Sequence, residues 1–264
     1  MATAITERIN LAGLQGFVMQ RLRSDGGFAA TPMQPHTIQD TYFAVSILRY
    51  LATLGLDDLS ASLATGATGS YLRDYARRHP AMPVKTAFQL QRLAHHLDLD
   101  LEIHWRPGWG ERVPDYEERW YEAVLKGGRA ADPGRFAPRR RTVKELCHYL
   151  RLQQVLSPGR LPAEAEEMIQ WLRRCQAPDG GFGFFPGTTS YIENSHYALV
   201  ALALLRSHAP HQDRAEKFIV SCQTASGGFS RNSKAAPFLD ASWHAVQAIR
   251  SLAPSTSFSS ASRR

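Results

Sequence analysis

The chain has 264 residues, of which 44% are hydrophobic, so one large domain or two small ones can bury a substantial core. Its formal net charge of +7 favours an anionic partner, and nucleic acid, acidic lipid and a phosphorylated metabolite fit that charge equally well. No apolar run reaches the roughly 18 residues that a transmembrane helix needs, and residues 1–10 lack the basic-then-apolar order of a signal peptide. We therefore expect no transmembrane segment and a cytoplasmic location.

Predicted helices follow one another in pairs. Apolar residues recur at helical spacing over residues 5–22, and an almost wholly apolar segment over 40–54 follows a glycine-rich turn. This order predicts an outer helix with one buried face and then an inner helix buried on most sides. It recurs along the chain, and we expect a third outer helix over 116–126 before a third inner helix over 142–155. The five predicted hairpins lie near residues 5–54, 57–98, 115–156, 162–206 and 212–252.

A short phrase recurs at the turn between outer and inner helices. It reads Cys-Gln-Ala-Pro-Asp-Gly-Gly-Phe-Gly at 175–183, Cys-Gln-Thr-Ala-Ser-Gly-Gly-Phe at 222–229 and Asp-Gly-Gly-Phe at 25–28. The glycine pair permits a tight turn because glycine accepts a positive φ without a Cβ clash. The predicted turns are separated by roughly 47 to 53 residues. Such a period predicts one all-α domain over 1–253, in which each hairpin buries its apolar face against its neighbours.

Three segments fall outside this repeat. Residues 99–114 have no regular period and contain Pro and Gly with Trp105 and Trp109, so we expect an aromatic and basic loop. A second basic loop over 129–141 precedes the third inner helix. The serine-rich tail over 254–264 is predicted to be disordered.

The first residues of the five predicted inner helices are expected to ring one end of the array. Helix N-termini carry unpaired N–H groups and a partial positive charge, so this ring favours an anion. Basic residues strengthen that preference at two of the five starts. Alternatively, the acidic and amide residues only cap their helices and the basic residues are solvated. The residues at this level are Asp40, Lys85, Arg141, Asn194 and Asp240.

Aromatic residues follow within the first turns of the same inner helices. Tyr42, Tyr197 and Trp243 are candidates for the apolar wall of a central funnel, in which a hydrocarbon chain would lie below a cationic mouth. The alternative is that these side chains belong to the ordinary core, which is the commoner role of an aromatic residue at helical spacing.

The Gly-Gly-Phe phrases are each followed about a dozen residues later by an acidic or amide residue that opens an apolar helix. They resemble the repeats of the protein prenyltransferase β subunits and of the squalene and terpene cyclases. The resemblance is strong over 163–252, clear over 17–54 and weak between. It implies an α/α toroid whose central cavity binds an isoprenoid. Relatives have about six hairpins, so a chain with five would leave a gap in the ring. The loop over 99–114 or a helical partner subunit could fill that gap, and the sequence does not decide whether the toroid closes.

The resemblance also implies site residues. In protein prenyltransferases an Asp, a Cys and a His at inner-helix starts hold a catalytic zinc, and the places that match them look like Asn194, His196 and Asp240. The cysteine is absent and the His and Asp have exchanged places, so His196 and Asp240 are the candidate ligands of zinc or magnesium. Arg231 and Lys234, which follow the last Gly-Gly-Phe turn, resemble the diphosphate-binding pair of the family.

The cyclases of this group protonate their substrate with the middle acid of Asp-x-Asp-Asp-Thr. Only Asp40 and Thr41 of that motif remain, and Gln39 stands where the acid would be. Glu193 lies at the acid's level in the fourth repeat. A carboxyl group in an apolar mouth can have a raised pKa and act as a proton donor, so Asp40, Glu193 and Asp240 compete for that role.

Two functional hypotheses follow. The favoured one is an enzyme that transfers or cyclises the chain of a prenyl diphosphate or prenylated substrate, with cationic groups on the head group and aromatic walls around a developing carbocation. It involves no nucleic acid. The alternative is a non-catalytic toroid with a filled cavity, acting as a ligand- or protein-binding module through the basic loop over 129–141.

Overall fold

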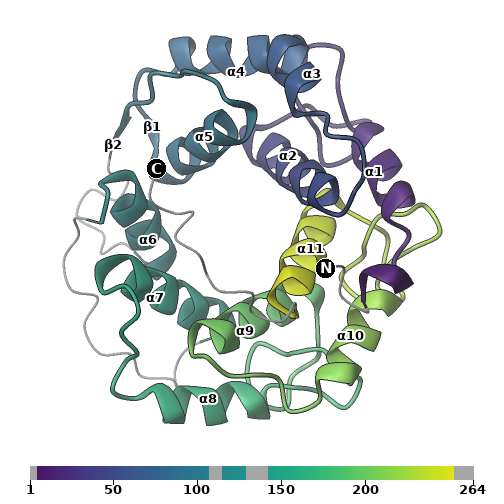
Figure 1. Cartoon of the computed structure of the whole chain (residues 1–264), viewed down its shortest axis with the longest axis vertical. Helices are drawn as coiled ribbons and strands as arrows, with labels where there is room; N and C mark the ends of the chain where they lie inside the picture. The colour runs from purple at the N-terminus through teal and green to yellow at the C-terminus, as the bar shows by residue number, and fades with distance from the viewer. Residues whose placement is uncertain (1–4, 107–114, 129–141, 253–264) are drawn as a thin grey trace.

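The computed structural model describes residues 5–106, 115–128 and 142–252, and it consists of two concentric layers of helices (Figure 1). Within the described residues six helices form the inner layer, and each contacts the next around a ring. The last of them contacts the first, so the inner ring closes within a single chain. The inner helices are α2 (Ile38–Thr53), α5 (Val84–Leu97), α6 (Tyr116–Leu125), α7 (Val143–Leu156), α9 (Ile192–Leu204) and α11 (Leu239–Leu252).

Shorter helices form the outer layer. Each presents apolar side chains to the inner layer, as the buried Met168 and Leu172 of α8 illustrate. A 3-10 helix over Thr6–Arg8 precedes them, and β1 (Met82–Pro83) pairs in parallel with β2 (Trp105–Arg106). The outer helices are α1 (Leu11–Met19), α3 (Ser60–Thr65), α4 (Ala67–Arg78), α8 (Ala165–Arg174) and α10 (Gln212–Ser221).

The all-α toroid that the sequence predicts is confirmed, with one difference in the third hairpin. The helix expected on the outside over 116–126 is α6, and it lies in the inner layer between α5 and α7. Its aromatic side chains Trp120 and Tyr121 face inward and pack against Phe88 of α5. Because this aromatic face is buried toward the centre, the ring contains six inner helices instead of five.

The loop over 99–114 is described only in its first part. Trp105 packs on the small cluster of Val84, Phe88 and Tyr121, so this part of the aromatic loop is attached to the ring. The predictions for residues 107–114, 129–141 and 254–264 concern segments outside the described ranges. No helix in the described part of the chain is long and apolar enough to cross a membrane.

The Gly-Gly-Phe turns join neighbouring repeats. Gly26, Gly180 and Gly227 have φ values of 98°, 95° and 88°, a region that strongly favours glycine. A Cβ on Gly227 would lie 2.2 Å from the backbone of Gly13 in α1, and one on Gly180 would lie 2.2 Å from the carbonyl of Arg214 in α10. Each of these turns therefore packs tightly against the beginning of another outer helix.

The phenylalanine of each turn connects that joint to the inner layer. Phe28, Phe182 and Phe229 are fully buried. Their backbone N–H groups donate to hydroxyl groups in the first turns of α2, α9 and α11, at distances of 2.9 to 3.0 Å. The turn thus fixes where the inner helix begins. The accepting residues are Thr41, Ser195 and Ser242.

The same joint ties the first repeat to the last. The N–H of Asn10 donates to Oε1 of Gln223 at 2.9 Å, and Nε2 of Gln223 donates to the carbonyl of Asn10 at 3.0 Å. Gln176 makes the equivalent pair of bonds with His211, at 3.0 Å each, between the fourth and fifth repeats. The chain therefore closes on itself through a contact that it also uses internally.

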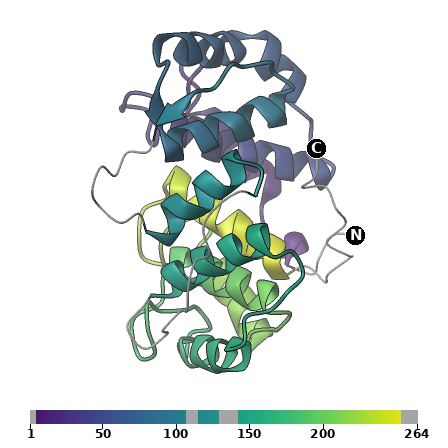
Figure 2. The ribbon, with the colours of Figure 1, turned by 90° about the vertical axis from the view of Figure 1, so that its left-hand side faces the viewer.

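The inner helices begin at one end of the barrel, which we call the rim. The loops that lead into α2, α9 and α11 project from this end, on the left in Figure 2. Along α6 and α7, Glu117 lies beside Lys144 and Trp120 lies beside His148, so these two helices run in the same direction. The expected ring of helix starts is present in the structure.

Candidate ligand-binding cavity

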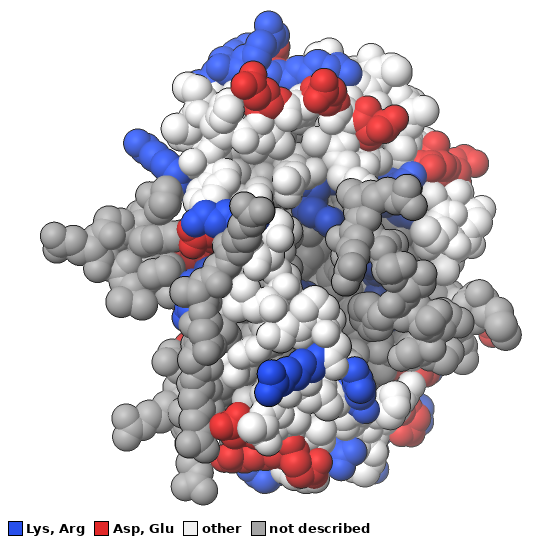
Figure 3. Space-filling model, turned by 60° about the vertical axis from the view of Figure 1, so that its left-hand side comes forward, with Lys and Arg blue, Asp and Glu red and all other residues white. Residues whose placement is uncertain are grey.

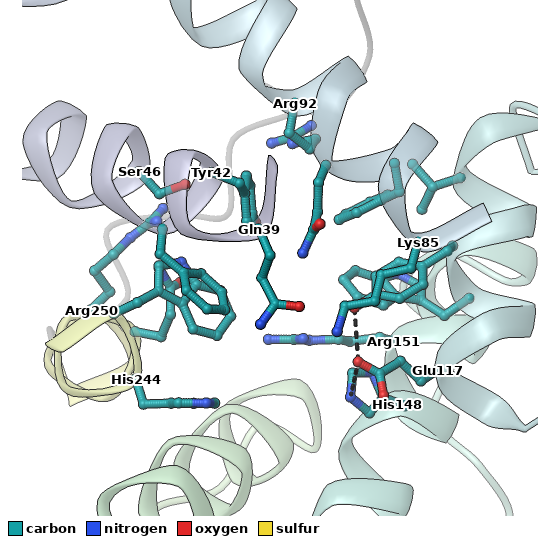
Figure 4. Close-up of a pocket in the computed structure, with 18 of the residues that line it drawn as sticks. Gln39, Tyr42, Ser46, Lys85, Arg92, Glu117, His148, Arg151, His244 and Arg250 are labelled. Atoms are coloured by element: carbon teal, nitrogen blue, oxygen red, sulfur yellow. Dashed lines mark hydrogen bonds and ion pairs between the residues drawn. The ribbon is translucent and has the colours of Figure 1, made fainter. Parts of the chain in front are cut away.

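The inner helices enclose a cavity of about 1500 Å³ (Figure 4). It extends from Gln39 and Asp240 at the rim to Thr53 and Arg250 near the ends of α2 and α11. All six inner helices contribute side chains to its wall. Sites for small molecules usually have roughly 300–1,000 Å³, so this cavity has room for a ligand larger than a typical drug-sized molecule.

A closed ring of aromatic side chains surrounds the cavity below the rim. Each ring contacts the next with centroids 5.0 to 6.5 Å apart, and every inner helix contributes at least one member. Aromatic faces carry partial negative charge and an apolar surface, so such a ring suits an apolar chain or a cationic centre. This aromatic belt consists of Tyr42, Phe88, Trp120, His148, Tyr197, His244 and Trp243.

Basic side chains outnumber acidic ones in the cavity wall. Arg92 and Arg151 are each the ninth residue of their helices, and Arg49 and Arg250 are each the twelfth. Figure 3 shows basic side chains inside the central hollow of the face that it displays. This charge balance suits an anionic ligand. The wall contains Arg49, Lys85, Arg92, Lys144, Arg151 and Arg250 against Glu117 and Asp240.

Arg151 extends from α7 into the cavity (Figure 4). Its Cζ lies 4.8 Å from the centroid of the Trp120 ring, and its Nη2 lies 3.2 Å from Nε2 of His196. Neither contact supplies a negative charge, and no carboxylate in the described residues forms an ion pair with this guanidinium. A partly buried cation without a counter-charge is costly, so Arg151 is available to an anionic ligand.

Two buried histidines extend the hydrogen-bonded chain that begins at Arg151. His196 is fully buried, and its Nδ1 lies 2.7 Å from Nδ1 of His244. A guanidinium has no acceptor, so Nε2 of His196 accepts from Arg151 and Nδ1 of His196 carries the proton that it donates to His244. His244 then carries its own proton on Nε2. Because His244 lines the cavity, its Nε2–H group offers a ligand a second hydrogen-bond donor beside the guanidinium of Arg151.

Burial keeps these histidines neutral. It lowers the pKa of His244 to about 3, and it lowers the pKa of His196 well below the ordinary value, with the neighbouring His244 and Arg151 acting in the same direction. Protonation of His244 on Nδ1 would place its N–H group against the N–H group of His196 across the 2.7 Å contact. At neutral pH, Arg151 is therefore the charged member of the group.

Glu117 anchors a second polar cluster beside the belt. Its carboxylate accepts a hydrogen bond from the Tyr121 hydroxyl at 2.8 Å and pairs with Lys144 Nζ at 2.6 Å. Burial alone would raise the pKa of Glu117, but the charges of His148 and Lys144 and the hydrogen bonds outweigh it and lower the pKa to about 2. Burial lowers the pKa of His148 to about 3. At neutral pH, Glu117 is ionised and is no proton donor.

Several buried polar atoms of the cavity wall have no hydrogen-bond partner. They include Nδ1 of His148 and Nε1 of Trp243, and Nε2 of His148 has only a long contact of 3.8 Å with Glu117 Oε1. Buried polar groups are almost always paired in folded proteins, so a cluster of unpaired ones indicates that something else binds there. Water and a ligand with polar atoms would both satisfy these groups.

The structure brings some of the predicted site residues to the cavity. The expected wall residues Tyr42, Tyr197 and Trp243 lie in the aromatic belt, and Lys85 points into the cavity (Figure 4). Asp240 lies in the wall at the rim.

Other predicted residues lie away from the cavity wall. Arg231 Nε pairs with Glu193 Oε1 at 2.7 Å, and neither side chain lines the cavity. Lys234 is exposed on the loop before α11. Asn194 is buried as the third residue of α9, and it is not a cap. Arg141 is outside the described residues.

Asp40 does not line the cavity either. Thr37 is the N-cap of α2, and its hydroxyl donates to Asp40 Oδ2 at 2.7 Å. Burial raises the pKa of Asp40, the hydrogen bond from Thr37 opposes this, and the charge of Asp240 adds to it. Asp40 is absent from the cavity wall, although its neighbour Gln39 points inward (Figure 4).

The residues implied for a metal do not form a fitting donor set. Both ring nitrogens of His196 face other side chains, Nδ1 facing His244 and Nε2 facing Arg151. Among the described residues no group of three or more His, Cys, Asp or Glu side chains could hold a metal ion. A cation held by His196 would also lie next to the guanidinium of Arg151, which is electrostatically unfavourable.

Sequence reasoning missed most of the polar wall. It compared only the starts of the inner helices, whereas Arg92 and Arg151 share a position two turns further along. That shared position was the available signal. No sequence signal indicated the contact between His196 and His244, because the residues are 48 positions apart and meet only through the packing of α9 on α11.

The comparison with known families agrees with this architecture. The model described as "Prenyltransferase alpha-alpha toroid domain" matches residues 4–83, 146–237 and 197–263. These matches cover well over half of the chain, which therefore belongs to the prenyltransferase alpha-alpha toroid family. No protein with curated annotation matches the chain.

Proposed function

We propose that this protein binds a prenyl diphosphate, or another isoprenoid with an anionic group, in its central cavity. The observation that carries the proposal is Arg151, a guanidinium that projects into an aromatic cavity and has no carboxylate partner. An anionic head group would supply the missing counter-charge. The apolar chain would lie against the aromatic belt.

Three further groups support a polar head beside Arg151. Lys85 points into the cavity, and the proton on Nε2 of His244 is free for a ligand. Arg92 adds a cation from α5. Charged hydrogen bonds contribute about 1.5 to 3 kcal/mol each, so two or three of them would give a diphosphate a large advantage over an uncharged alcohol.

The chemistry that fits this site is ionisation of the bound molecule. When the bond between the allylic carbon and the diphosphate oxygen breaks, the cations would stabilise the leaving diphosphate, and the aromatic faces would stabilise the carbocation. The neutral imidazole of His148 has unpaired nitrogens in the wall and could accept a proton from the cation. We propose prenyl transfer or cyclisation on this basis. A binding protein without turnover is the alternative, because Glu193 and Asp40 lie outside the wall and only Asp240 of the three candidate acids lies in it, at the rim.

Native mass spectrometry tests the binding step. The whole chain is incubated separately with farnesyl diphosphate, geranylgeranyl diphosphate and farnesol, each with and without zinc or magnesium. We expect a retained diphosphate and little retained farnesol. Absence of any retained ligand under all conditions would remove the proposal. Analysis of the same incubations for hydrocarbon or prenylated products separates an enzyme from a binding protein.

A further inference from the structure

Exposed apolar side chains gather at the rim. Among the described residues, five large apolar side chains are at least 38% exposed. Four belong to the loops over 29–37, 183–191 and 230–238, which lead into α2, α9 and α11 and which we call the rim loops. The fifth, Leu161, follows α7 at the opposite end. The four on the rim loops are Met33, Phe184, Phe185 and Phe238.

The rim loops combine this apolar surface with positive charge. Their 27 residues include no Asp or Glu, but they do include Arg231 and Lys234. Lys234 is exposed, and its ammonium group has no partner in the described residues. The acids that follow these loops, Asp40, Glu193 and Asp240, belong to the inner helices, and Glu193 pairs with Arg231. An apolar surface whose own loops carry only basic charge has the chemistry of a surface that binds at the boundary of an anionic lipid layer.

The loops are held in place by the ring below them. The N–H of Val143 in α7 donates to the carbonyl of Phe184 at 3.1 Å, and the N–H of Ile192 in α9 donates to the carbonyl of Arg231 at 2.9 Å. The loops over 183–191 and 230–238 are thus each fixed to the start of a neighbouring inner helix. The loop over 29–37 is held within its own repeat, where the N–H of Thr37 donates to the carbonyl of Phe28 at 3.2 Å. The exposed side chains therefore form a preorganised surface around one end of the cavity, which reaches the rim at Gln39 and Asp240.

We propose that the rim loops dock the protein on the surface of a membrane that contains anionic lipid. The Met and Phe side chains would enter the boundary between head groups and acyl chains, while the ammonium group of Lys234 would contact anionic head groups. Arg231 contributes less, because Glu193 already pairs with it. A protein partner could also cover an apolar surface. The absence of acidic residues from all three loops favours the lipid surface, because a protein partner would not require one sign of charge throughout.

Vesicle sedimentation tests this inference. The whole protein is mixed with vesicles of phosphatidylcholine alone or with about one-fifth phosphatidylserine. We expect sedimentation with the mixed vesicles, and a loss of more than about tenfold in partitioning for the triple variant Met33→Ser, Phe185→Ser, Phe238→Ser. Lys234→Gln should weaken binding about fivefold. The matched control Leu161→Ser, at the opposite end, should bind like the unchanged protein.

Two results would overturn the inference. One is an unchanged protein that stays in the supernatant with both kinds of vesicle. The other is a triple variant that still sediments as well as the Leu161→Ser control. Size-exclusion chromatography is run in parallel, and a self-associated form that only the triple variant loses, without vesicle binding, would assign the surface to a second copy. The triple variant should still bind farnesyl diphosphate, because it leaves the cavity wall intact, so this test is independent of the proposed function.

Discussion

Nδ1 of His196 lies 2.7 Å from Nδ1 of His244, and the two imidazoles share one hydrogen bond between α9 and α11. Replacing either residue with Phe leaves the other with an unpaired buried nitrogen, which should cost about 1 to 3 kcal/mol of unfolding free energy. The double variant should cost less than the sum of the two single variants, by about 1 kcal/mol or more. Urea denaturation of the four proteins measures this difference. Additive single effects would show that the contact contributes no coupling.

His148 should make the fold less stable than a phenylalanine at the same position would. Both of its ring nitrogens are buried without hydrogen-bond partners, and Nε2 lies 3.8 Å from Glu117 Oε1, beyond hydrogen-bond distance. The ring itself packs between Trp120 and Tyr197. His148→Phe keeps an aromatic ring in the belt and removes the unpaired nitrogens, so we expect an increase of about 1 kcal/mol in the free energy of unfolding. Thermal and urea denaturation would reveal it. A destabilised variant would mean that these nitrogens are satisfied by ordered water in the free protein.

Buried neutral histidines should make the fold sensitive to moderate acid. Burial lowers the pKa of His96 to about 4 and that of His148 and His244 to about 3, whereas an unfolded histidine titrates near 6.5. Their contribution to stability is therefore complete above about pH 6.5 and is lost as the pH falls toward these lowered values. Each should add up to about 1.4 kcal/mol per pH unit to the slope. His96→Gln should flatten the curve of unfolding free energy between about pH 6.5 and 4.5, and an unchanged slope would contradict this assignment.

Gly227 should be far less replaceable than Gly55. Both have positive φ, 88° and 96°, so an alanine at either site costs about 1 to 2 kcal/mol for backbone conformation. Only at Gly227 would the new Cβ also lie 2.2 Å from the backbone of Gly13, whereas nothing lies within 4 Å at Gly55. We expect Gly227→Ala to lose several kcal/mol or fail to fold, and Gly55→Ala to fold. Equal losses in thermal denaturation would refute the tight joint between the last and first repeats.

The repeat phrase predicts the fold because its requirements are local. Gly227 needs a positive φ and Phe229 needs a buried pocket, and both needs recur wherever the turn recurs. The position of α6 was predicted wrongly, because Trp120 and Tyr121 suit an amphipathic outer helix as well as a cavity wall. Only the packing against α5 and α7 decides between them.

The site was predictable only at the level of its general character. A ring of helix starts with cationic and aromatic neighbours could be inferred, and Tyr42, Lys85 and Trp243 do line the cavity. The resemblance implied a diphosphate-binding role for Arg231 only because this residue follows a Gly-Gly-Phe turn. In the structure that side chain turns to Glu193, and local sequence does not encode such a choice of partner.

The affinity of the cavity for farnesyl diphosphate, measured by calorimetry on matched arginine variants, tests the central claim most directly. Arg151→Gln should weaken binding by about 1.5 to 3 kcal/mol, which is more than tenfold, because it removes the cation that has no other counter-charge. Arg231→Gln should weaken it less, since Arg231 pairs with Glu193 outside the wall. Arg173→Gln on the exposed surface of α8 is the control and should leave affinity unchanged. Full affinity in Arg151→Gln, or a larger loss in Arg231→Gln, would contradict a head-group site at Arg151.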